Sequence, residues 1–154
     1  MVFSQKKYSS EKNKLPAAVI FDVDGTLTVG PHHSRSPYDY DMVHMDHPNH
    51  IIIELAIHHK KMGREILIVT GRDESCRKNT IEWLDFYNVP YDKLFMRPDG
   101  VVKKDSYVKK EIFTENIHQK YNVLCVIDDR LSVLEMWNSL GVYTFNVNQF
   151  QKLF

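Results

Sequence analysis

The stretch AAVIFDVDGTLT, residues 17–28, decides the fold, because an apolar run leads directly into two aspartates. Residues 17–21 are apolar without alternation, which indicates a strand buried on both faces, as in a parallel sheet covered by helices. Asp22 and Asp24 follow at alternate positions, and Gly25 permits a sharp turn. The stretch therefore predicts a buried strand that ends in a pair of carboxylates.

Strands and helices alternate along the rest of the chain. After a loop at 29–46, we expect helices at 50–62, 75–87, 106–121 and 131–140, and strands at 65–69, 93–96, 122–127 and 142–145. This alternation predicts an α/β fold, a Rossmann-like three-layer sandwich with a mainly parallel central sheet. We expect a single domain over residues 16–154, behind a flexible tail at residues 1–15.

The composition excludes several classes of function. Twenty Lys and Arg residues balance twenty Asp and Glu residues, so the chain has no overall basic field for nucleic acid, although this balance allows a local basic patch. No apolar run reaches the roughly 20 residues that span a bilayer, and the N-terminus has no signal-peptide core. With only two cysteines, a disulfide framework is not expected. We therefore expect a cytoplasmic protein with no membrane partner.

Polar side chains follow three of the predicted strands. They are Asp22 and Asp24, then the Thr-Gly-Arg sequence at residues 70–72, and finally Asp128 with Asp129. Ligands of open α/β sheets bind at the carboxyl ends of the strands. If these strands are neighbours, the three groups meet in one crevice, and this convergence carries more weight than any single motif.

The two aspartates after the first strand are suited to hydrolysis of a phosphate monoester. A carboxylate nucleophile, Asp22, divides the reaction into formation and hydrolysis of an aspartyl phosphate. The second carboxylate, Asp24, can protonate the leaving alkoxide and then accept a proton from water. A plain turn or helix cap after a core strand is the alternative structural explanation.

The carboxylates also predict a Mg²⁺ site. Mg²⁺ takes oxygen ligands, and several carboxylates around a phosphate would repel it without a cation. Asp128 is the expected ligand together with Asp22, and Asp129 either joins them or caps the following helix. Thr70 and Arg72 are expected to bind phosphoryl oxygens. Lys109 would add a positive charge there, but the residues alone do not distinguish it from the neighbouring lysines, which are Lys103, Lys104 and Lys110.

The motifs resemble those of the haloacid dehalogenase superfamily of phosphohydrolases. Residues 21–28 resemble its first motif, Thr70 its second, a later lysine its third, and residues 127–129 its fourth. The resemblance implies Asp22 as nucleophile, Asp24 as general acid and base, and Mg²⁺ held by Asp22, the Asp24 backbone carbonyl and Asp128. Asp129 is a further candidate ligand.

A closer resemblance is to the 3′-phosphatase domain of the bacteriophage polynucleotide kinase–phosphatase. The segments AVIFDVDGTL, SPYDYDMV, GRD, VKKDSYVKKEIF and VIDDRLSVLEMWNSLGV carry it. It implies Arg35, Arg72, Arg97 and Asp105 as substrate-binding residues, and it singles out Lys109, four residues after Asp105. Thr70 stands where that domain has serine. The substrate so implied is the 3′-phosphate of a polynucleotide or nucleotide.

The resemblance does not extend to a kinase. The G-x-x-x-x-G-K-[ST] loop that binds ATP phosphates is absent, so we expect a stand-alone phosphatase that does not use ATP. Few residues are left for a cap domain, which leaves the site open to a polymer end. Two alternatives remain: a small-molecule nucleotidase, and a non-catalytic module that binds phosphorylated nucleic-acid ends.

Overall fold

The central sheet of the described residues contains five parallel strands in the order β3-β2-β1-β4-β5. The computed structural model describes residues 14–29 and 40–147. The strands are β1 (Ala17–Phe21), β2 (Glu65–Asp73), β3 (Lys93–Arg97), β4 (Asn122–Asp128) and β5 (Thr144–Asn146). The predicted parallel sheet is thus confirmed, with the AAVIF strand at its centre.

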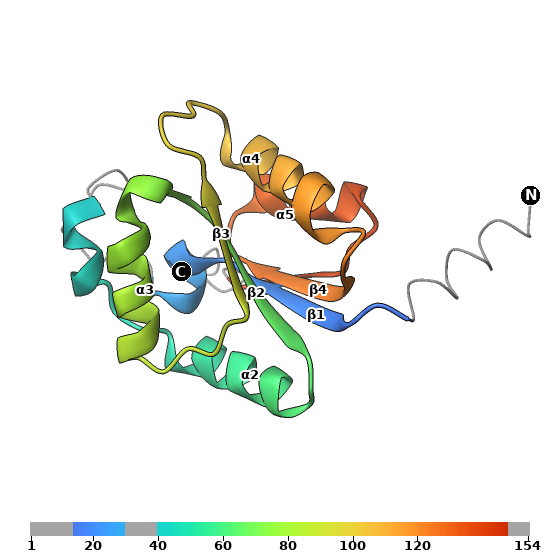
Figure 1. Cartoon of the computed structure of the whole chain (residues 1–154), viewed down its shortest axis with the longest axis horizontal. Coiled ribbons are helices and arrows are strands. Elements are labelled where there is room, and N and C mark those ends of the chain that lie inside the picture. The colour runs from blue at the N-terminus through green and yellow to red at the C-terminus, as the bar shows by residue number, and fades with distance from the viewer. Residues whose placement is uncertain (1–13, 30–39, 148–154) are drawn as a thin grey trace, which may run out of the picture.

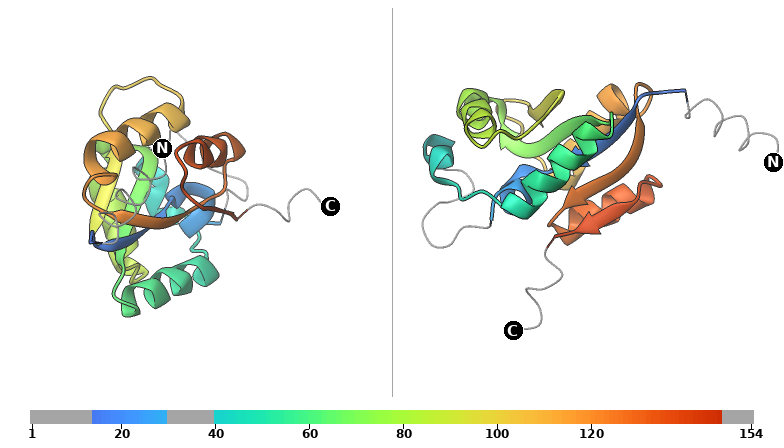
Figure 2. Two further views of the ribbon diagram at one scale, coloured as in Figure 1. Left: turned by 90° about the vertical axis from the view of Figure 1, so that its right-hand side faces the viewer. Right: turned by 90° about the horizontal axis from the view of Figure 1, so that it is seen from below.

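Helices cover both faces of the sheet. α2 (His50–Lys61) and α3 (Arg77–Phe86) lie on one face, and α4 (Asp105–Ile112) and α5 (Leu131–Ser139) lie on the other (Figure 1, Figure 2). Successive side chains of a strand point to opposite faces. In β1, Val19 and Phe21 accordingly pack in one apolar core, and Ala18 and Ile20 pack in the other. The expected three-layer α/β sandwich is confirmed.

Several element boundaries differ from those predicted. The loop expected at 29–46 contains a short 3-10 helix, η2 (Tyr40–Met45). The Thr-Gly-Arg sequence was expected after a strand, but β2 continues through it, because Asp73 still pairs with Arg97 of β3. The helix expected at 106–121 ends as α4 and continues as a wider turn, η4 (Phe113–Ile117), which buries both of its terminal residues.

The described parts of the loops at the carboxyl edge of the sheet contain only short helical turns. Between β1 and α2 the described residues form only η1 (Val23–Leu27) and η2, and η3 (Glu74–Cys76) joins β2 to α3. No large cap domain is found in the part of the chain that the structure describes. Within those same ranges, no helix is long and apolar enough to cross a membrane. The tail expected at 1–15 lies outside the described residues up to residue 13.

Candidate active site

The carboxyl ends of β1, β2 and β4 lie side by side, as the sequence predicted. Phe21, the last residue of β1, is opposite Ile68 of β2 and Ile127 of β4. The next residue, Asp22, donates its backbone N–H to the Ile127 carbonyl oxygen at 3.0 Å. The nucleophile predicted from sequence therefore lies between the other two polar strand ends.

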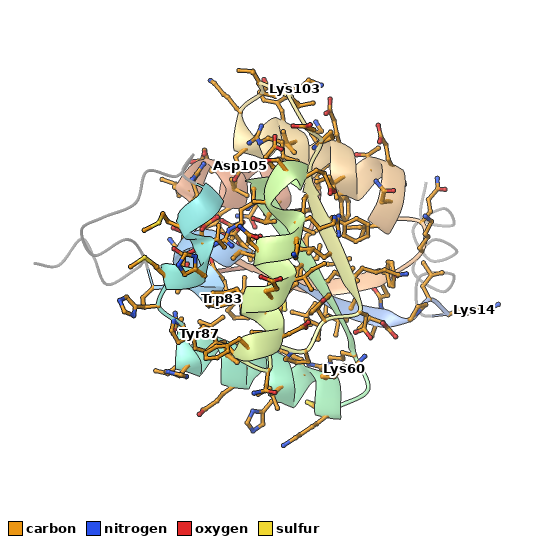
Figure 3. The ribbon with its side chains drawn as sticks, turned by 60° about the vertical axis from the view of Figure 1, so that its left-hand side comes forward. Lys14, Lys60, Trp83, Tyr87, Lys103 and Asp105 are labelled. Atoms are coloured by element: carbon orange, nitrogen blue, oxygen red, sulfur yellow. The ribbon has the colours of Figure 1, made fainter. Side chains whose placement is uncertain are left out.

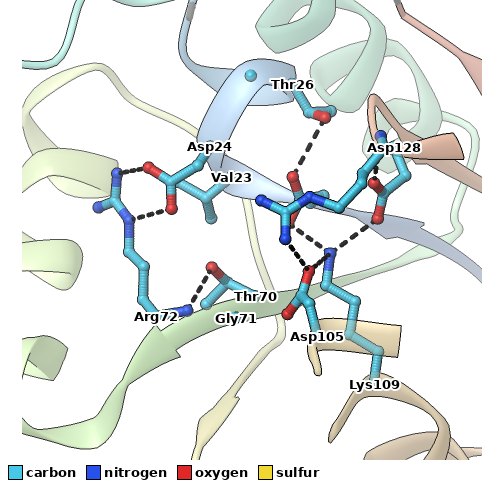
Figure 4. A network of polar contacts seen from close by, with 12 residues as sticks. Val23, Asp24, Thr26, Thr70, Gly71, Arg72, Asp105, Lys109 and Asp128 are labelled. Atoms are coloured by element: carbon cyan, nitrogen blue, oxygen red, sulfur yellow. Dashed lines mark hydrogen bonds and ion pairs between the residues drawn. The ribbon is translucent and has the colours of Figure 1, made fainter. Parts of the chain in front are cut away.

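Lys109 lies at the centre of a group of carboxylates, which we call the Lys109 cluster: Asp22, Asp105, Lys109, Asp128 and Asp129. The Lys109 side chain is only 1% exposed. Its Nζ donates to Asp22 Oδ1 at 2.7 Å and to Asp128 Oδ2 at 2.8 Å (Figure 4). Asp105 Oδ2, one helical turn earlier, lies 3.4 Å away. One ammonium group is thus shared by three carboxylates.

The pKa values in this cluster follow from burial and from an excess of negative charge. Burial alone would lower the pKa of Lys109, but the charges of Asp22, Asp128 and Asp105 raise it above its ordinary value. Burial raises the pKa of Asp22 well above its usual value, and Lys109 opposes this shift. Burial, reinforced by the charge of Asp128, raises the pKa of Asp129 to about 6. The cluster therefore favours the binding of additional positive charge.

Three of these carboxylates lie close enough together to hold a divalent cation. One oxygen from each of Asp22, Asp128 and Asp129 lies within 4.8 Å of the others. Carboxylate oxygens are the ligands that Mg²⁺ prefers. The close approach of Asp129 depends on Gly25, because a Cβ added there would lie 2.3 Å from Asp129 Oδ2. These residues fit a Mg²⁺ ion.

The start of α5 distinguishes the two adjacent aspartates. Arg130 is the N-cap residue and makes no capping bond with its side chain. Its backbone N–H donates to Asp128 Oδ1 at 3.1 Å. Asp128, rather than Asp129, is therefore the aspartate of this pair that accepts the Arg130 N–H, and the Asp129 carboxylate lies against Gly25.

Arg72 forms the centre of a second group, which we call the Arg72 cluster: Asp24, Asp46, Arg72 and Thr80. The guanidinium donates through Nε to Asp24 Oδ2 at 2.9 Å and through Nη2 to Asp24 Oδ1 at 2.7 Å (Figure 4). Nη2 also contacts Asp46 Oδ2 at 2.5 Å, and Nη1 donates to Thr80 Oγ1 at 3.3 Å. Burial would lower the pKa of Arg72, but Asp24 and Asp46 raise it above its ordinary value.

This arrangement differs from the role predicted for Arg72. The sequence predicted a guanidinium directed at a phosphate, whereas the Arg72 side chain is 1% exposed and grips the Asp24 carboxylate. Asp24 itself remains 42% exposed. Asp46 and Thr80 were not predicted as site residues, because Asp46 lies in a segment expected to be a loop, Thr80 lies within a helix, and neither belongs to a motif. A contact between Arg72 and substrate stays a prediction.

Thr70 and Arg97 lie close to both clusters. Thr70 is fully buried, and its Oγ1 accepts the Arg72 backbone N–H at 3.2 Å. Arg97 donates through Nε to the Gly71 carbonyl at 2.9 Å and through Nη1 to the Lys103 carbonyl at 2.7 Å. Its Nη2 lies 3.5 Å from Asp105 Oδ1. Arg97 therefore holds the loop before α4 and Asp105 in place. Arg35, the remaining predicted residue, lies outside the described residues.

Two glycine positions allow carboxylates to approach the backbone. A Cβ added at Gly71 would lie 2.1 Å from Asp105 Oδ1, just as one at Gly25 would collide with Asp129. The Gly25 N–H donates to Thr28 Oγ1 at 3.2 Å. The glycines of the two motifs thus make room for acidic side chains.

The fold and the site together define the class of protein: a phosphatase domain of the haloacid dehalogenase type. The chain belongs to the family described as the polynucleotide kinase PNKP phosphatase domain, which it matches over residues 16–151. The resemblance seen in the sequence is thereby confirmed.

Proteins similar to this chain include a viral protein and two solved structures. The chain is 35% identical over 139 residues to a bifunctional polynucleotide kinase/RNA ligase of Autographa californica nuclear polyhedrosis virus. The match covers 88% of this chain and 20% of that protein. A structure of a Pnkp1/Rnl/Hen1 complex matches with a TM-score of 0.83 and 36% identity, over 87% of this chain and 46% of that one. A structure of the Pnkp1/Rnl/Hen1 RNA repair complex matches with a TM-score of 0.82 and 36% identity, over 86% and 42%.

A more distant structure supports the fold alone. The haloacid dehalogenase domain of the effector protein Lem4 from Legionella pneumophila matches with a TM-score of 0.57 and 17% identity. It covers 90% of this chain and 88% of that one. The chain thus spans a fifth of the curated viral relative and less than half of the Pnkp1-complex chains, but nearly all of the Lem4 domain.

Proposed function

We propose that this chain is a Mg²⁺-dependent phosphomonoesterase that removes 3′-terminal phosphates from polynucleotides through an aspartyl phosphate on Asp22. The observation that carries the proposal is the position of Lys109, whose Nζ bonds both Asp22 Oδ1 and Asp128 Oδ2. A nucleophile, a cation for the phosphate and metal-binding carboxylates thereby meet in one buried cluster. Membership of the polynucleotide kinase phosphatase family supports the same reaction.

In the first half of the reaction, Asp22 attacks the phosphorus atom. A bond forms between an Asp22 carboxylate oxygen and phosphorus, and the bond from phosphorus to the 3′ oxygen breaks. Asp24 gives its proton to that oxygen, so a 3′-hydroxyl leaves. The bidentate grip of Arg72 orients the Asp24 carboxylate, which at 42% exposure is accessible to a leaving group.

In the second half, water hydrolyses the aspartyl phosphate. Asp24 takes a proton from the water molecule as its oxygen attacks phosphorus. The bond between phosphorus and the Asp22 oxygen then breaks, inorganic phosphate leaves, and the Asp22 carboxylate is restored. Thr26 Oγ1 lies 3.3 Å from Asp22 Oδ2 and, with Lys109, holds both carboxylate oxygens in a fixed orientation.

Asp22, Asp128 and Asp129 would hold the Mg²⁺ ion, with the Asp24 backbone carbonyl as a further ligand. When bound, the ion offsets the repulsion between carboxylates and phosphate and polarises a phosphoryl oxygen. Lys109 supplies a second positive charge beside the nucleophile, and Asp105 holds its ammonium group from one helical turn away. Thr70, Arg97 and Arg35 complete the proposed substrate site.

Two findings favour a polynucleotide end as the substrate. The similar proteins include a polynucleotide kinase/RNA ligase and an RNA repair complex. The described residues also place no large cap over the carboxyl edge of the sheet, so a long substrate has access. Both cysteines are buried and unpaired, which fits the reducing cytoplasm that we propose as its location.

Release of inorganic phosphate from matched oligonucleotides tests this function. The substrates carry one phosphate, at the 3′ or the 5′ end, and a nucleoside 3′-monophosphate is assayed beside them. We expect release from the 3′-phosphorylated oligonucleotide that chelation stops and that Asp22→Asn lowers by at least about 10⁴-fold. Release from mononucleotides alone would indicate a nucleotidase, and binding without any turnover would indicate a binding module.

A further inference from the structure

The guanidinium of Arg72 is held on two sides. Its Nε and Nη2 together grip the Asp24 carboxylate, at 2.9 and 2.7 Å. On the other side, its Nη1 donates to Thr80 Oγ1 at 3.3 Å, while Nη2 also contacts Asp46 Oδ2. Among the described residues, Thr80 is thus the hydrogen-bond partner of Nη1. Because a guanidinium is planar and rigid, fixing Nη1 also fixes the edge that faces Asp24.

The Thr80 hydroxyl is buried inside a helix. Thr80 lies in the interior of α3 and is 0% exposed. A buried hydroxyl is costly unless it is hydrogen-bonded, and threonine is a weaker helix former than most residues. In a helix, such a hydroxyl commonly bonds the carbonyl oxygen one turn earlier. Here the bonds of Thr80 Oγ1 go to side chains, Arg72 Nη1 and, at 3.8 Å, Cys76 Sγ. The hydroxyl is therefore directed at the guanidinium.

The same face of α3 also supports Asp46. Trp83 comes three residues after Thr80, a spacing at which two side chains share one face of a helix. Its Nε1 donates to the Asp46 backbone carbonyl at 2.9 Å (Figure 3). One face of α3 thus contacts the Arg72 cluster at two points, the guanidinium and the segment that carries Asp46.

We propose that Thr80 is a positioning residue, whose hydroxyl fixes the Arg72 guanidinium and thereby aims the Asp24 carboxylate at the leaving 3′ oxygen. This inference rests on the function proposed above, in which Asp24 is the general acid and base. The Asp24 side chain is 42% exposed, and its backbone is non-helical within η1, with φ −72° and ψ 115°. Its orientation therefore depends on Arg72. Without the Thr80 hydroxyl, Nη1 would be buried and unpaired, so the guanidinium would turn toward another acceptor and move the Asp24 carboxylate with it.

The experiment compares Thr80→Val, which removes the hydroxyl, with Thr80→Ser, which keeps it. Thr144→Val is the control, because it removes a hydroxyl from the edge strand β5, where Thr144 Oγ1 donates to Asn138 Oδ1 at 3.0 Å. Each variant is assayed on a 3′-phosphorylated oligonucleotide and on p-nitrophenyl phosphate, whose leaving group is a stable anion that needs no proton. Melting temperatures confirm that each variant is folded, and Thr80→Ala replaces Thr80→Val if the latter does not fold.

For Thr80→Val we expect kcat/KM for the oligonucleotide to fall about 10–100-fold, which is part of the roughly 10²–10⁴-fold that a general acid contributes. For p-nitrophenyl phosphate, kcat/KM should change less than about threefold, because the first step on this substrate does not need the proton of Asp24. Its kcat should fall, since Asp24 must still take a proton from water in the second step. A burst of p-nitrophenolate stoichiometric with the enzyme should then precede the steady state. Thr80→Ser and Thr144→Val should keep the wild-type ratio of the two kcat/KM values.

Three results would overturn the proposal. Equal losses of kcat/KM on both substrates would do so, since a loss of folded enzyme or of phosphate binding has that effect. Unchanged kinetics of Thr80→Val would exclude any role of the hydroxyl. A loss in Thr80→Ser as large as that in Thr80→Val would assign the effect to the methyl group and hence to packing.

Failure of the proposed function is distinguishable from failure of this inference. If the wild type hydrolyses a nucleoside 3′-monophosphate and not the oligonucleotide, the proposed polynucleotide substrate fails. The mononucleotide has the same alkoxide leaving group, so it then replaces the oligonucleotide in the comparison. If the wild type hydrolyses neither, crystal structures of the wild type and Thr80→Val decide the inference. A displaced Asp24 carboxylate supports it, and an unchanged Arg72–Asp24 pair refutes it.

Discussion

The Lys109 cluster and the Arg72 cluster each surround a buried cation with carboxylates, but the carboxylates differ in how exposed they are. Lys109 is shared by Asp22, Asp105 and Asp128, which are themselves 10% exposed or less. Arg72 is shared by Asp24, which is 42% exposed, and Asp46, which is 14% exposed. The first cluster thus holds its surplus negative charge out of water, whereas the second exposes part of its charge to solvent.

This difference shows what each cluster is built to do. A surplus of buried carboxylates is costly unless a cation joins them, so we expect a bound metal ion to stabilise the Lys109 cluster. In the Arg72 cluster, two hydrogen bonds from the guanidinium orient one carboxylate, Asp24, which we propose as the general acid and base. We therefore expect metal and pH to change mainly the stability of the Lys109 cluster. The Arg72 cluster should depend mainly on the positions of its side chains.

Removing the central cation of each cluster should have the largest effect. Lys109→Met leaves three buried carboxylates without their cation and should lower the free energy of unfolding by about 3–5 kcal/mol in the absence of metal. Arg72→Met should lower it by about 2 kcal/mol, because the exposed Asp24 can hydrate. Urea unfolding with chelator and with Mg²⁺ measures both. Mg²⁺ should restore part of the stability of Lys109→Met alone, and equal responses of the two variants would contradict the comparison.

Gly71→Ala should act on activity more than on stability. The new Cβ would lie 2.1 Å from Asp105 Oδ1, so the Asp105 carboxylate must move away from Lys109 and Arg97. Misplacing a cluster of this kind costs about 100-fold in kcat. Gly63→Ala is a control for backbone strain without a steric clash, since its φ is +76° and a Cβ there meets nothing within 4 Å. It should lower stability and leave kcat unchanged. Full activity of Gly71→Ala would show that Asp105 need not hold Lys109.

The effect of Asp129→Asn on the melting temperature should depend on pH, because the substitution removes one of the surplus negative charges of the Lys109 cluster. The pKa of Asp129 in the folded protein is about 6, above its ordinary value, so its ionisation destabilises the fold as pH rises through 6. In chelator, Asp129→Asn should melt about 3 °C above the wild type at pH 7.5, and this gain should vanish below pH 4. With Mg²⁺ the order should reverse, because the wild type keeps the metal ligand. A gain independent of pH would point to packing instead.

The fold was largely predictable from the sequence because each buried strand is a local apolar run. AAVIF, EILIV and NVLCVI all became parallel strands, and the helices between them began within two residues of the predicted positions. The end of β2 was predicted too early, since Thr70, Gly71 and Arg72 show no strand pattern. They span an irregularity between the Val69–Phe95 and Asp73–Arg97 pairs, and the strand extends past them because Asp73 pairs with β3.

The burial of Lys109 could not be predicted from the local sequence. Among neighbouring lysines, it looked like one more solvated side chain, and only the family resemblance singled it out. In the structure Lys103, Lys104 and Lys110 are exposed, whereas Lys109 is 1% exposed. Its burial depends on the carboxylates that β1 and β4 bring to α4 from residues 87 and 19 positions away.

The sequence by itself determined the strands, their order along the chain and the acidic residues at their ends, because these follow from short-range apolar patterns and residue chemistry. Only the tertiary structure decided the partners. It directed Arg72 at Asp24, brought Asp46 into the same cluster and placed Arg130 over Asp105. The physical reason is that charge pairing depends on distance in space, which chain position does not encode when the partners come from different strands and helices.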